Sequence, residues 1–263
     1  MRSAVLGLTL LAGCLAVLPA RAQDTGPQAP AQAAPAQAAP PNCEVPAYLL
    51  TSDSTLTHVA DAVKSKGPLN VLVVGSRSST ILSSETSAYP AKLQAMLKEK
   101  LPEVPVTLSV ELQSGKTAED VAGNLVKFVE AKRPTLVIWQ TGTVDAMRSI
   151  DPDDFRNAID EGIAALQKAG VDVVLINLQY SPRTETMISG SPYLDSIRVV
   201  AQQHNVPLFD RFAIMRHWNE AGDFDLFSAA HGPELAKRVH GCLGRALTKF
   251  VIDAAHLSPA QQN

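Results

Sequence analysis

Short apolar runs alternate with longer amphipathic segments from residue 43 to the end of the chain. The runs are rich in Val, Leu and Ile and cover 70–74, 106–110, 135–139 and 171–176, with a weaker run at 206–209. Each run is too short for a helix and is apolar on both faces, which is typical of a strand covered on both sides. The pattern therefore predicts about five strands between two layers of helices.

The segments between the runs predict helices over 91–101, 117–132, 152–169 and 192–204, followed by two more near 212–221 and 233–255. Thr117 is a suitable N-cap, Asp151 precedes a proline at the first helical position, and Gly170 follows the end of the third helix. Alternating strands and helices imply right-handed crossovers and a parallel sheet. The predicted fold is an α/β/α sandwich with three layers and a flavodoxin-like parallel sheet of about five strands.

Ligands bind such sheets at the carboxyl ends of the strands, so the polar loops after the strands are the candidates for chemistry. Residues 75–80 (GSRSST) are rich in hydroxyl groups and could place a nucleophile, bind an anion with Arg77, or form a simple polar turn. Gly115 could direct its N–H at an oxyanion, although a tight turn explains this glycine almost as well. Of the 6 histidines, only His231 lies at such a loop, and an ordinary surface histidine is the alternative.

The first 22 residues have the features of a secretory signal peptide. Arg2 precedes an apolar stretch over 4–18, and residues 20–22 (ARA) form a cleavage site between small residues. Residues 11–14 (LAGC) also match the bacterial lipoprotein pattern, in which Cys14 would carry a lipid. Residues 15–18 stay apolar where a lipoprotein turns polar, which favours simple secretion. We expect a periplasmic or secreted bacterial protein, with a lipid anchor at Cys14 as the alternative.

Composition and net charge exclude further classes of protein. Removal of the signal leaves 21 basic and 26 acidic side chains, a net charge of −5, which lacks the basic face that nucleic acids require. No apolar run after the N-terminus reaches the roughly 18 residues of a membrane span. Residues 23–42 consist mainly of Pro, Ala and Gln and predict a disordered linker, whereas 43–255 form the folded domain and 256–263 a tail.

Two cysteines remain after the signal peptide, Cys43 and Cys242. Export to an oxidising compartment and the even count favour a disulfide between them, with two separately buried thiols as the alternative. In the chain-entropy model a loop of this length stabilises the fold by about 4–5 kcal/mol. No cluster of His, Cys, Asp or Glu has the spacing of metal ligands, and the P-loop pattern is absent, so no metal or cofactor is predicted.

Taken in chain order, four loops resemble the motif blocks of the SGNH/GDSL hydrolase superfamily. Residues 75–80 take the place of the GDS block, 114–117 (SGKT) resemble S-G-D-T, 142–145 (GTVD) resemble G-T-N-D, and 228–231 (SAAH) resemble D-x-x-H. The resemblance covers about residues 68–250 and includes Tyr89 and Pro90 before the first helix. It implies a serine hydrolase with Gly115 as an oxyanion donor and His231 as the base.

The nucleophile cannot be assigned uniquely from this resemblance, because the first block lacks the family aspartate. Matching Ser-Arg-Ser-Ser-Thr to G-D-S-x-T selects Ser78. The spacing to Tyr89 favours Ser76 instead, and matching Gly75 to the family glycine would place Arg77 at the nucleophile position.

Two further positions depart from the family pattern. Val144 replaces the family asparagine, with Gln140, Thr141 or Thr143 as possible substitutes. Ser228 replaces the aspartate that orients the base. Loss of one oxyanion donor typically costs about 2.7–4 kcal/mol. Loss of the orienting acid lowers turnover on the order of 10⁴-fold in a Ser-His-Asp triad. These departures leave either a slow or differently built esterase, or a site that only binds.

The sequence thus supports two functional hypotheses. The first is an exported ester hydrolase acting on an acyl or acetyl group, for example on an envelope glycan or lipid, with Ser78 as nucleophile, His231 as base and Gly115 as oxyanion donor. The alternative is an inactive module of the same fold that binds carbohydrate or a protein. Candidate substrate-binding residues are Arg77, Ser76, Gln140 and Thr143.

Overall fold

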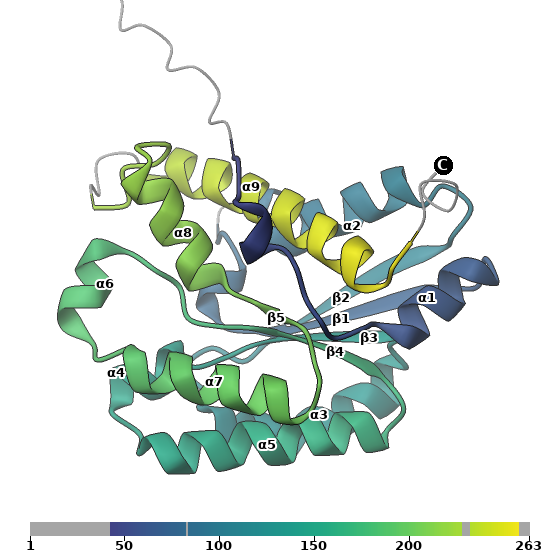
Figure 1. The fold of residues 1–263 in the computed structure, drawn as a ribbon, viewed down its shortest axis with the longest axis horizontal. Coiled ribbons are helices and arrows are strands. Elements are labelled where there is room, and N and C mark those ends of the chain that lie inside the picture. Colours follow the sequence, from purple (N-terminus) through teal and green to yellow (C-terminus); the bar gives the residue numbers. More distant parts are fainter. Residues whose placement is uncertain (1–42, 83, 228–231, 258–263) are drawn as a thin grey trace, which may run out of the picture. The chain divides into compact units, whose positions relative to one another are not determined.

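The computed structural model describes residues 43–82, 84–227 and 232–257 of the chain. Within these ranges, five parallel strands form one sheet in the order β2-β1-β3-β4-β5 (Figure 1). The strands are β1 (Leu69–Gly75), β2 (Val106–Leu112), β3 (Leu136–Gln140), β4 (Asp172–Ile176) and β5 (Leu208–Phe209). This strand order is the flavodoxin-like one, so the predicted sandwich with a parallel sheet is confirmed.

The central strands are apolar because both of their faces are buried. In β1, Val71 packs into one core cluster and its neighbour Leu72 into the other, on the opposite face of the sheet. Every residue of β3 and β4 is buried. The expectation of two covered faces is wrong for β2, where Val110 and Leu112 are 40% and 41% exposed, because β2 pairs with β1 alone and forms an edge of the sheet.

Helices cover both faces of the sheet (Figure 1). One face is packed by α3 (Ala118–Lys132), α5 (Pro152–Lys168) and α7 (Ser191–Gln203). The other is packed by α1 (Thr57–Lys64), α2 (Tyr89–Lys100), α8 (Arg211–Glu220) and α9 (Gly232–Ala254). The short helices α4 (Thr143–Arg148) and α6 (Pro182–Met187) follow β3 and β4. Among the described helices, none is long and apolar enough to cross a bilayer.

The longer helices begin and end at the capping residues that the sequence indicates. Thr117 and Asp120 form a capping box at the start of α3, in which each side chain accepts the backbone N–H of the other residue. At the start of α5, the carboxylate of Asp151 accepts the N–H of Asp153. Gly170 follows α5 with a φ of +72°, a left-handed conformation that glycine adopts readily. The predicted caps are therefore confirmed.

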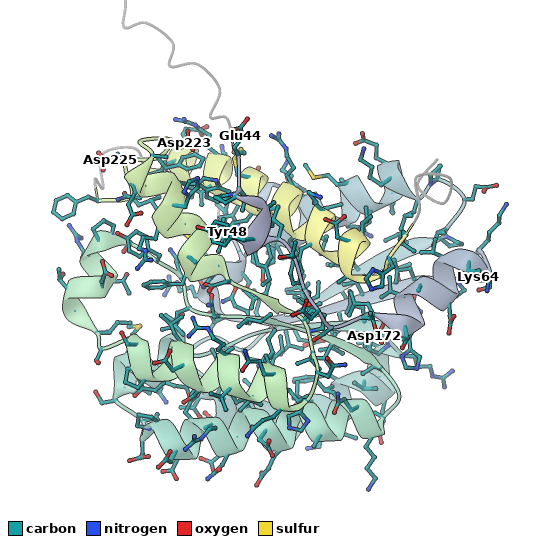
Figure 2. All side chains as sticks on the ribbon, viewed as in Figure 1. Glu44, Tyr48, Lys64, Asp172, Asp223 and Asp225 are labelled. Atoms are coloured by element: carbon teal, nitrogen blue, oxygen red, sulfur yellow. A yellow bond between two sulfur atoms is a disulfide. The ribbon has the colours of Figure 1, made fainter. Side chains whose placement is uncertain are left out.

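The sequence pattern did not predict α1, α4 or α6, because helices of 8 residues or fewer carry little periodicity. Helix α1 is held instead by a tertiary contact with the buried carboxylate of Asp172 at the start of β4 (Figure 2). That carboxylate accepts the N–H of Val59 at 2.9 Å, and His58 Nδ1 lies 2.9 Å from its other oxygen. The contact closes the amino-terminal edge of the sheet, opposite the edge where ligands are expected.

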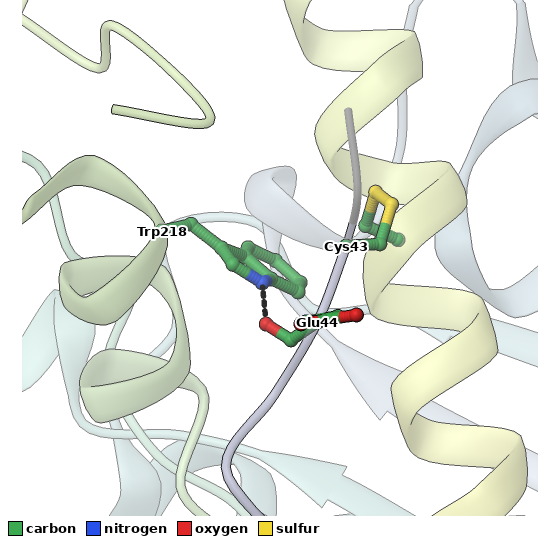
Figure 3. Close-up of a disulfide and its surroundings, with 4 residues drawn as sticks. Cys43, Glu44 and Trp218 are labelled. Carbon is green, nitrogen blue, oxygen red and sulfur yellow. Dashed lines mark hydrogen bonds between the residues drawn. A yellow bond between two sulfur atoms is a disulfide. The ribbon is translucent and has the colours of Figure 1, made fainter. Parts of the chain in front are cut away.

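The predicted disulfide is confirmed. Cys43 is bonded to Cys242 in α9, with 5.4 Å between the two Cα atoms and 199 residues of sequence separation (Figure 3). Next to this bond, the indole N–H of Trp218 in α8 donates to the carbonyl of Glu44 at 2.8 Å. The start of the described chain is therefore fastened to both α8 and α9, the two helices that cover the same side of the site.

Removal of this cross-link tests its contribution to stability. The Cys43→Ala/Cys242→Ala variant is expected to lose about 2–5 kcal/mol of unfolding free energy. Without the cross-link, the unfolded chain has more conformational entropy and is therefore more stable relative to the folded state. Urea denaturation monitored by circular dichroism measures the loss. Adding dithiothreitol should destabilise the wild type and leave the double variant unchanged, and an equal response of the two proteins would contradict the assignment.

Candidate active site

The turn after β1 brings three serine side chains together at the carboxyl edge of the sheet. The chain leaves the strand at Gly75 and folds into a 3₁₀ turn over Arg77–Ser79, closed by a bond of 2.9 Å from the Ser79 N–H to the Ser76 carbonyl. A side chain at Gly75 would clash with Ser79, whose Cβ lies 2.8 Å from the place of the missing Cβ. Glycine at this position therefore allows the turn to fold back onto the strand end.

The amide of Gln140, the last residue of β3, connects these hydroxyl groups. Its Nε2 donates to Ser78 Oγ at 2.8 Å and to Ser76 Oγ at 3.1 Å. Its Oε1 accepts from Ser79 Oγ at 2.8 Å and from the phenol of Tyr89 at 3.2 Å. Ser76 Oγ and Ser78 Oγ are themselves 3.3 Å apart. Because one buried amide makes four of these contacts, Gln140 helps to position both candidate nucleophiles.

Arg211, the first residue of α8, places a buried guanidinium beside this network. Its side chain is 1% exposed, and its Nη1 donates to Gln140 Oε1 at 3.0 Å. Nη1 and Nη2 both lie 3.4 Å from Ser78 Oγ, and Nη1 is 3.5 Å from the Ser78 carbonyl. Its Nε has no acceptor. Within the described ranges no carboxylate forms an ion pair with Arg211, so all of its acceptors are neutral.

The neighbouring titratable groups do not supply a counter-charge. Burial lowers the pKa of Arg211 to about 10, so the guanidinium stays protonated at neutral pH. Burial raises the pKa of the Tyr89 phenol, which therefore stays neutral. His240 in α9 accepts the N–H of Tyr89 on Nδ1 at 3.0 Å, and burial, together with the positive charge of Arg211, lowers its pKa to about 4. His240 is thus neutral and carries its proton on Nε2.

A cavity of about 350 Å³ lies next to Ser78. Its polar lining is formed by Ser78, Gln179, Ser181, Arg211 and His240. Its larger apolar and aromatic lining side chains are those of Tyr180, Met215, Leu226, Leu235, Val239 and Leu243. Ser76 lies instead on a separate hollow of about 10 Å³, which it shares with Gln140, Thr143 and Val144. That hollow has room for about one water molecule. Of the two candidate nucleophiles, Ser78 therefore lies at the cavity that has room for a substrate, and Ser76 lies at the small hollow.

The remaining predicted site residues are placed as follows. Arg77 is exposed to solvent and lines neither of these two cavities. Gly115 is also exposed, has a φ of +72° and lines neither cavity; a Cβ there would face Arg148 at 4.0 Å. Thr143 Oγ1 accepts the N–H of Gln179 at 3.5 Å. His231 and Ser228 lie outside the described residues.

The buried carboxyl of Asp145, in the segment that resembles G-T-N-D, fixes the loops around the site. Its Oδ1 accepts the N–H of Ala118 at 2.8 Å, which ties the start of α3 to α4, the short helix after β3. Burial raises the pKa of Asp145, because the charged form is partly desolvated. Asp145 therefore has a structural role in the described contacts.

Sequence reasoning missed Arg211 and the cavity-facing role of His240. Arg211 comes directly after Asp210 and β5, at the same edge of the sheet as the other strand ends. Applying the strand-end rule to the weak run at 206–209 would have included Arg211 among the candidates. His240 looked like an ordinary packing residue of the last helix. Its ring does pack against Tyr89, with 5.8 Å between centroids, but it also lines the cavity.

Comparison with known proteins gives a consistent set of similarities. Residues 42–257 match the sequence model of the non-GDSL lipase-like family. A search of the curated proteins finds no match. A two-domain esterase (CEX) active on acetylated mannans has 15% identity and a TM-score of 0.62, covering 81% of this chain and 57% of its own. An acetyl xylan esterase, AlAXEase, has 18% identity and a TM-score of 0.55. The match covers 68% of this chain and 100% of that esterase. The psychrotrophic esterase EstA from Pseudoalteromonas sp. has 16% identity and a TM-score of 0.54. The match covers 69% of this chain and 98% of EstA. At these identities the structures support the fold.

No carboxylate of the described residues pairs with Arg211, and supplying one tests this finding. Gln140→Glu keeps the shape of the side chain and places a carboxylate against Nη1 of Arg211, so the unfolding free energy is expected to rise by about 1–3 kcal/mol at neutral pH. Gln140→Met removes the acceptor and is expected to lower it by a similar amount. Urea denaturation of both variants measures the difference. A Gln140→Glu protein no more stable than the wild type would show that the guanidinium is already compensated.

The neutral state of His240 predicts a pH dependence of stability. The unfolded chain binds a proton at this residue near pH 6.5 and the folded protein only near pH 4. The stabilisation is therefore complete above about pH 6.5, and up to about 3 kcal/mol is lost as the pH falls toward 4. His240→Gln is expected to make the unfolding free energy less dependent on pH between about pH 6.5 and pH 4. The matched variant of an exposed residue, His256→Gln, should keep the wild-type slope, and identical profiles for the two variants would refute the assignment.

Proposed function

The chain belongs to the non-GDSL lipase-like family, within the SGNH/GDSL-like hydrolases, and we propose that it hydrolyses a carboxylic ester with Ser78 as the nucleophile. The observation that carries this proposal is the position of Ser78 Oγ. It lines a cavity of about 350 Å³ and lies within 3.4 Å of the N–H groups of Gln140 and Arg211. A hydroxyl next to preorganised donors is what an acyl-transfer site requires.

In the proposed reaction, Ser78 Oγ attacks the ester carbonyl and forms a bond to carbon, while its proton passes to the base. Negative charge develops on the carbonyl oxygen, and the proposed donors to it are the N–H groups of Gln140 and Arg211 that lie within 3.4 Å of Ser78 Oγ. We assign them the oxyanion role that the sequence alone favoured for Gly115. Collapse of the tetrahedral intermediate releases the alcohol, which takes the proton from the base. Water then attacks the acyl-enzyme by the same route and releases the acid.

The proposed base is His231, which lies outside the described residues. Its neighbour in the sequence, Gly232, begins α9 and lines the cavity beside Ser78. His240 lines the same cavity but does not suit this role. Its Nδ1 accepts the Tyr89 N–H, and its Nε2 carries the proton in the neutral ring. A ring in this state donates a hydrogen bond toward the cavity and does not accept a proton from serine.

The proposed substrate is an ester of a small molecule or of a glycan. Two structurally similar proteins are described as an acetyl xylan esterase and as an esterase active on acetylated mannans. The proposal includes export through residues 1–22, a linker over 23–42 and action in the periplasm or outside the cell, with lipidation of Cys14 as the alternative to simple secretion. The Cys43–Cys242 disulfide fits an oxidising compartment of this kind.

A second candidate function, ligand binding without hydrolysis, is favoured by two observations. Apart from the hydroxyl of Ser76, the described partners of Ser78 Oγ are the N–H donors of Gln140 and Arg211. In the described part of the chain, no imidazole or carboxylate makes a hydrogen bond to Ser78. In addition, Val144 occupies the position of the family asparagine.

Hydrolysis and its nucleophile can be tested together with p-nitrophenyl esters and a fluorophosphonate probe. Ser78→Ala and His231→Ala are each expected to lower kcat/KM by a factor on the order of 10⁴ or more, because the nucleophile and its base act as one unit. Ser76→Ala, the matched control on the same turn, should lower it by less than about tenfold. Mass spectrometry of the labelled peptide should place the adduct on Ser78 and show no adduct in the His231→Ala protein.

Two results would contradict this assignment. An adduct on Ser76 would identify Ser76, which lines the small hollow, as the nucleophile in place of Ser78. No adduct, under conditions that label a control esterase, would support the binding function instead.

A further inference from the structure

Arg211 is a buried cation, and its neighbours in the described part of the chain leave it without an opposite charge and leave one of its donors unsatisfied. Its hydrogen bonds go to the amide of Gln140 and to the hydroxyl and carbonyl of Ser78, all of which are neutral. Its Nε has no acceptor. Burying a charge without an opposite charge is costly, and buried guanidinium groups are ordinarily paired. A structure that maintains this arrangement is well suited to receive an anion.

The surroundings of Arg211 indicate what kind of anion fits. The guanidinium lines the 350 Å³ cavity together with Ser78 and His240. His240 Nδ1 is occupied by the Tyr89 N–H, so the ring presents an N–H donor from its other nitrogen. The polar side chains that line the cavity are therefore one cation, Arg211, and the neutral groups of Ser78, Gln179, Ser181 and His240, with no carboxylate among the described lining residues. Beyond them, α8 and α9 contribute apolar side chains, including those of Met215 and Leu235.

We propose that this cavity binds an apolar monocarboxylic acid, with its carboxylate on Arg211 and its hydrocarbon tail along the apolar side chains of α8 and α9. The planar guanidinium matches the two oxygens of a carboxylate, and the exchange of neutral acceptors for a charged one strengthens its hydrogen bonds. Binding also repays part of the cost of burying Arg211. The tail covers apolar surface that otherwise faces water in the open cavity.

Other anionic ligands fit these groups less well. A phosphate monoester carries nearly two negative charges and three strong acceptor oxygens, whereas Arg211 is the only cationic side chain among the residues described as lining this cavity. A sugar could use the polar side chains of Gln179 and Ser181, but its hydroxyl groups would then face the apolar wall formed by Met215, Leu235, Val239 and Leu243. In an acid with an apolar tail, the carboxylate matches the charge of Arg211 and the tail matches the apolar side chains of the cavity.

The consequence for catalysis rests on the proposed function. If Ser78 hydrolyses an ester, the acid that binds here is the reaction product, and its carboxylate lies beside the nucleophile that released it. The substrate is then an ester of an apolar acid in preference to an acetate ester. The binding itself requires no hydrolysis, so the two proposals can fail separately.

Isothermal titration calorimetry of the purified protein with acetate, butanoate, hexanoate and octanoate tests the proposal directly. Affinity is expected to rise about fourfold for each added methylene until the cavity is filled. Arg211→Met should weaken octanoate binding by about thirtyfold or more, since the carboxylate loses its charged partner. Arg216→Met is the matched control: it removes an exposed arginine from the same helix and should leave the affinity unchanged. Ser78→Ala should also still bind octanoate.

A second variant separates loss of binding from loss of folding. Arg211→Met should keep the wild-type circular dichroism spectrum, because a buried charge is replaced by an apolar side chain of similar length. Gln140→Glu leaves Arg211 in place but gives it an internal carboxylate, so this variant should fold and fail to bind octanoate. Octanoate binding that survives in both folded variants would overturn the proposal. Phosphate binding as tight as octanoate binding, or affinity independent of chain length, would overturn it as well.

Discussion

The site depends on the hydrogen bonds of one buried amide, that of Gln140 at the carboxyl end of β3. Its Nε2 donates to the hydroxyl groups of Ser76 and Ser78. Its Oε1 accepts hydrogen bonds from Ser79, Tyr89 and Arg211. These partners come from the turn after β1, from α2 and from α8. A buried amide with all its partners in place is rigid, because no partner can leave without an unsatisfied polar group.

The parallel sheet explains why these groups meet at one edge. All five described strands run in the same direction, so their carboxyl ends lie together and the polar residues after β1, β3 and β5 face a common space. The disulfide at Cys43 and the bond from Trp218 to Glu44 fasten α8 and α9 on one side of that space. Asp145 fastens the start of α3 on the other.

Electrostatics connects the proposed reaction with the proposed ligand. Burial keeps Tyr89 and His240 neutral, so the single charge among these groups is the cation Arg211. An environment of this kind favours negative charge next to Ser78, whether it develops on an ester oxygen or is carried by a bound carboxylate. The donors that the family pattern assigns to an asparagine, replaced here by Val144, would then come from Gln140 and Arg211.

The sequence by itself determined the strands, the longer helices, the caps at Thr117 and Asp151 and the Cys43–Cys242 pairing. These features depend on local periodicity, on capping chemistry or on cysteine count, all of which can be read along the chain. The contact between Ser78 and Arg211 joins residues 133 positions apart and forms only when the start of α8 meets the turn after β1. No periodic pattern distinguishes an arginine buried without a counter-ion from one on the surface, because that difference lies in what the folded chain places around it.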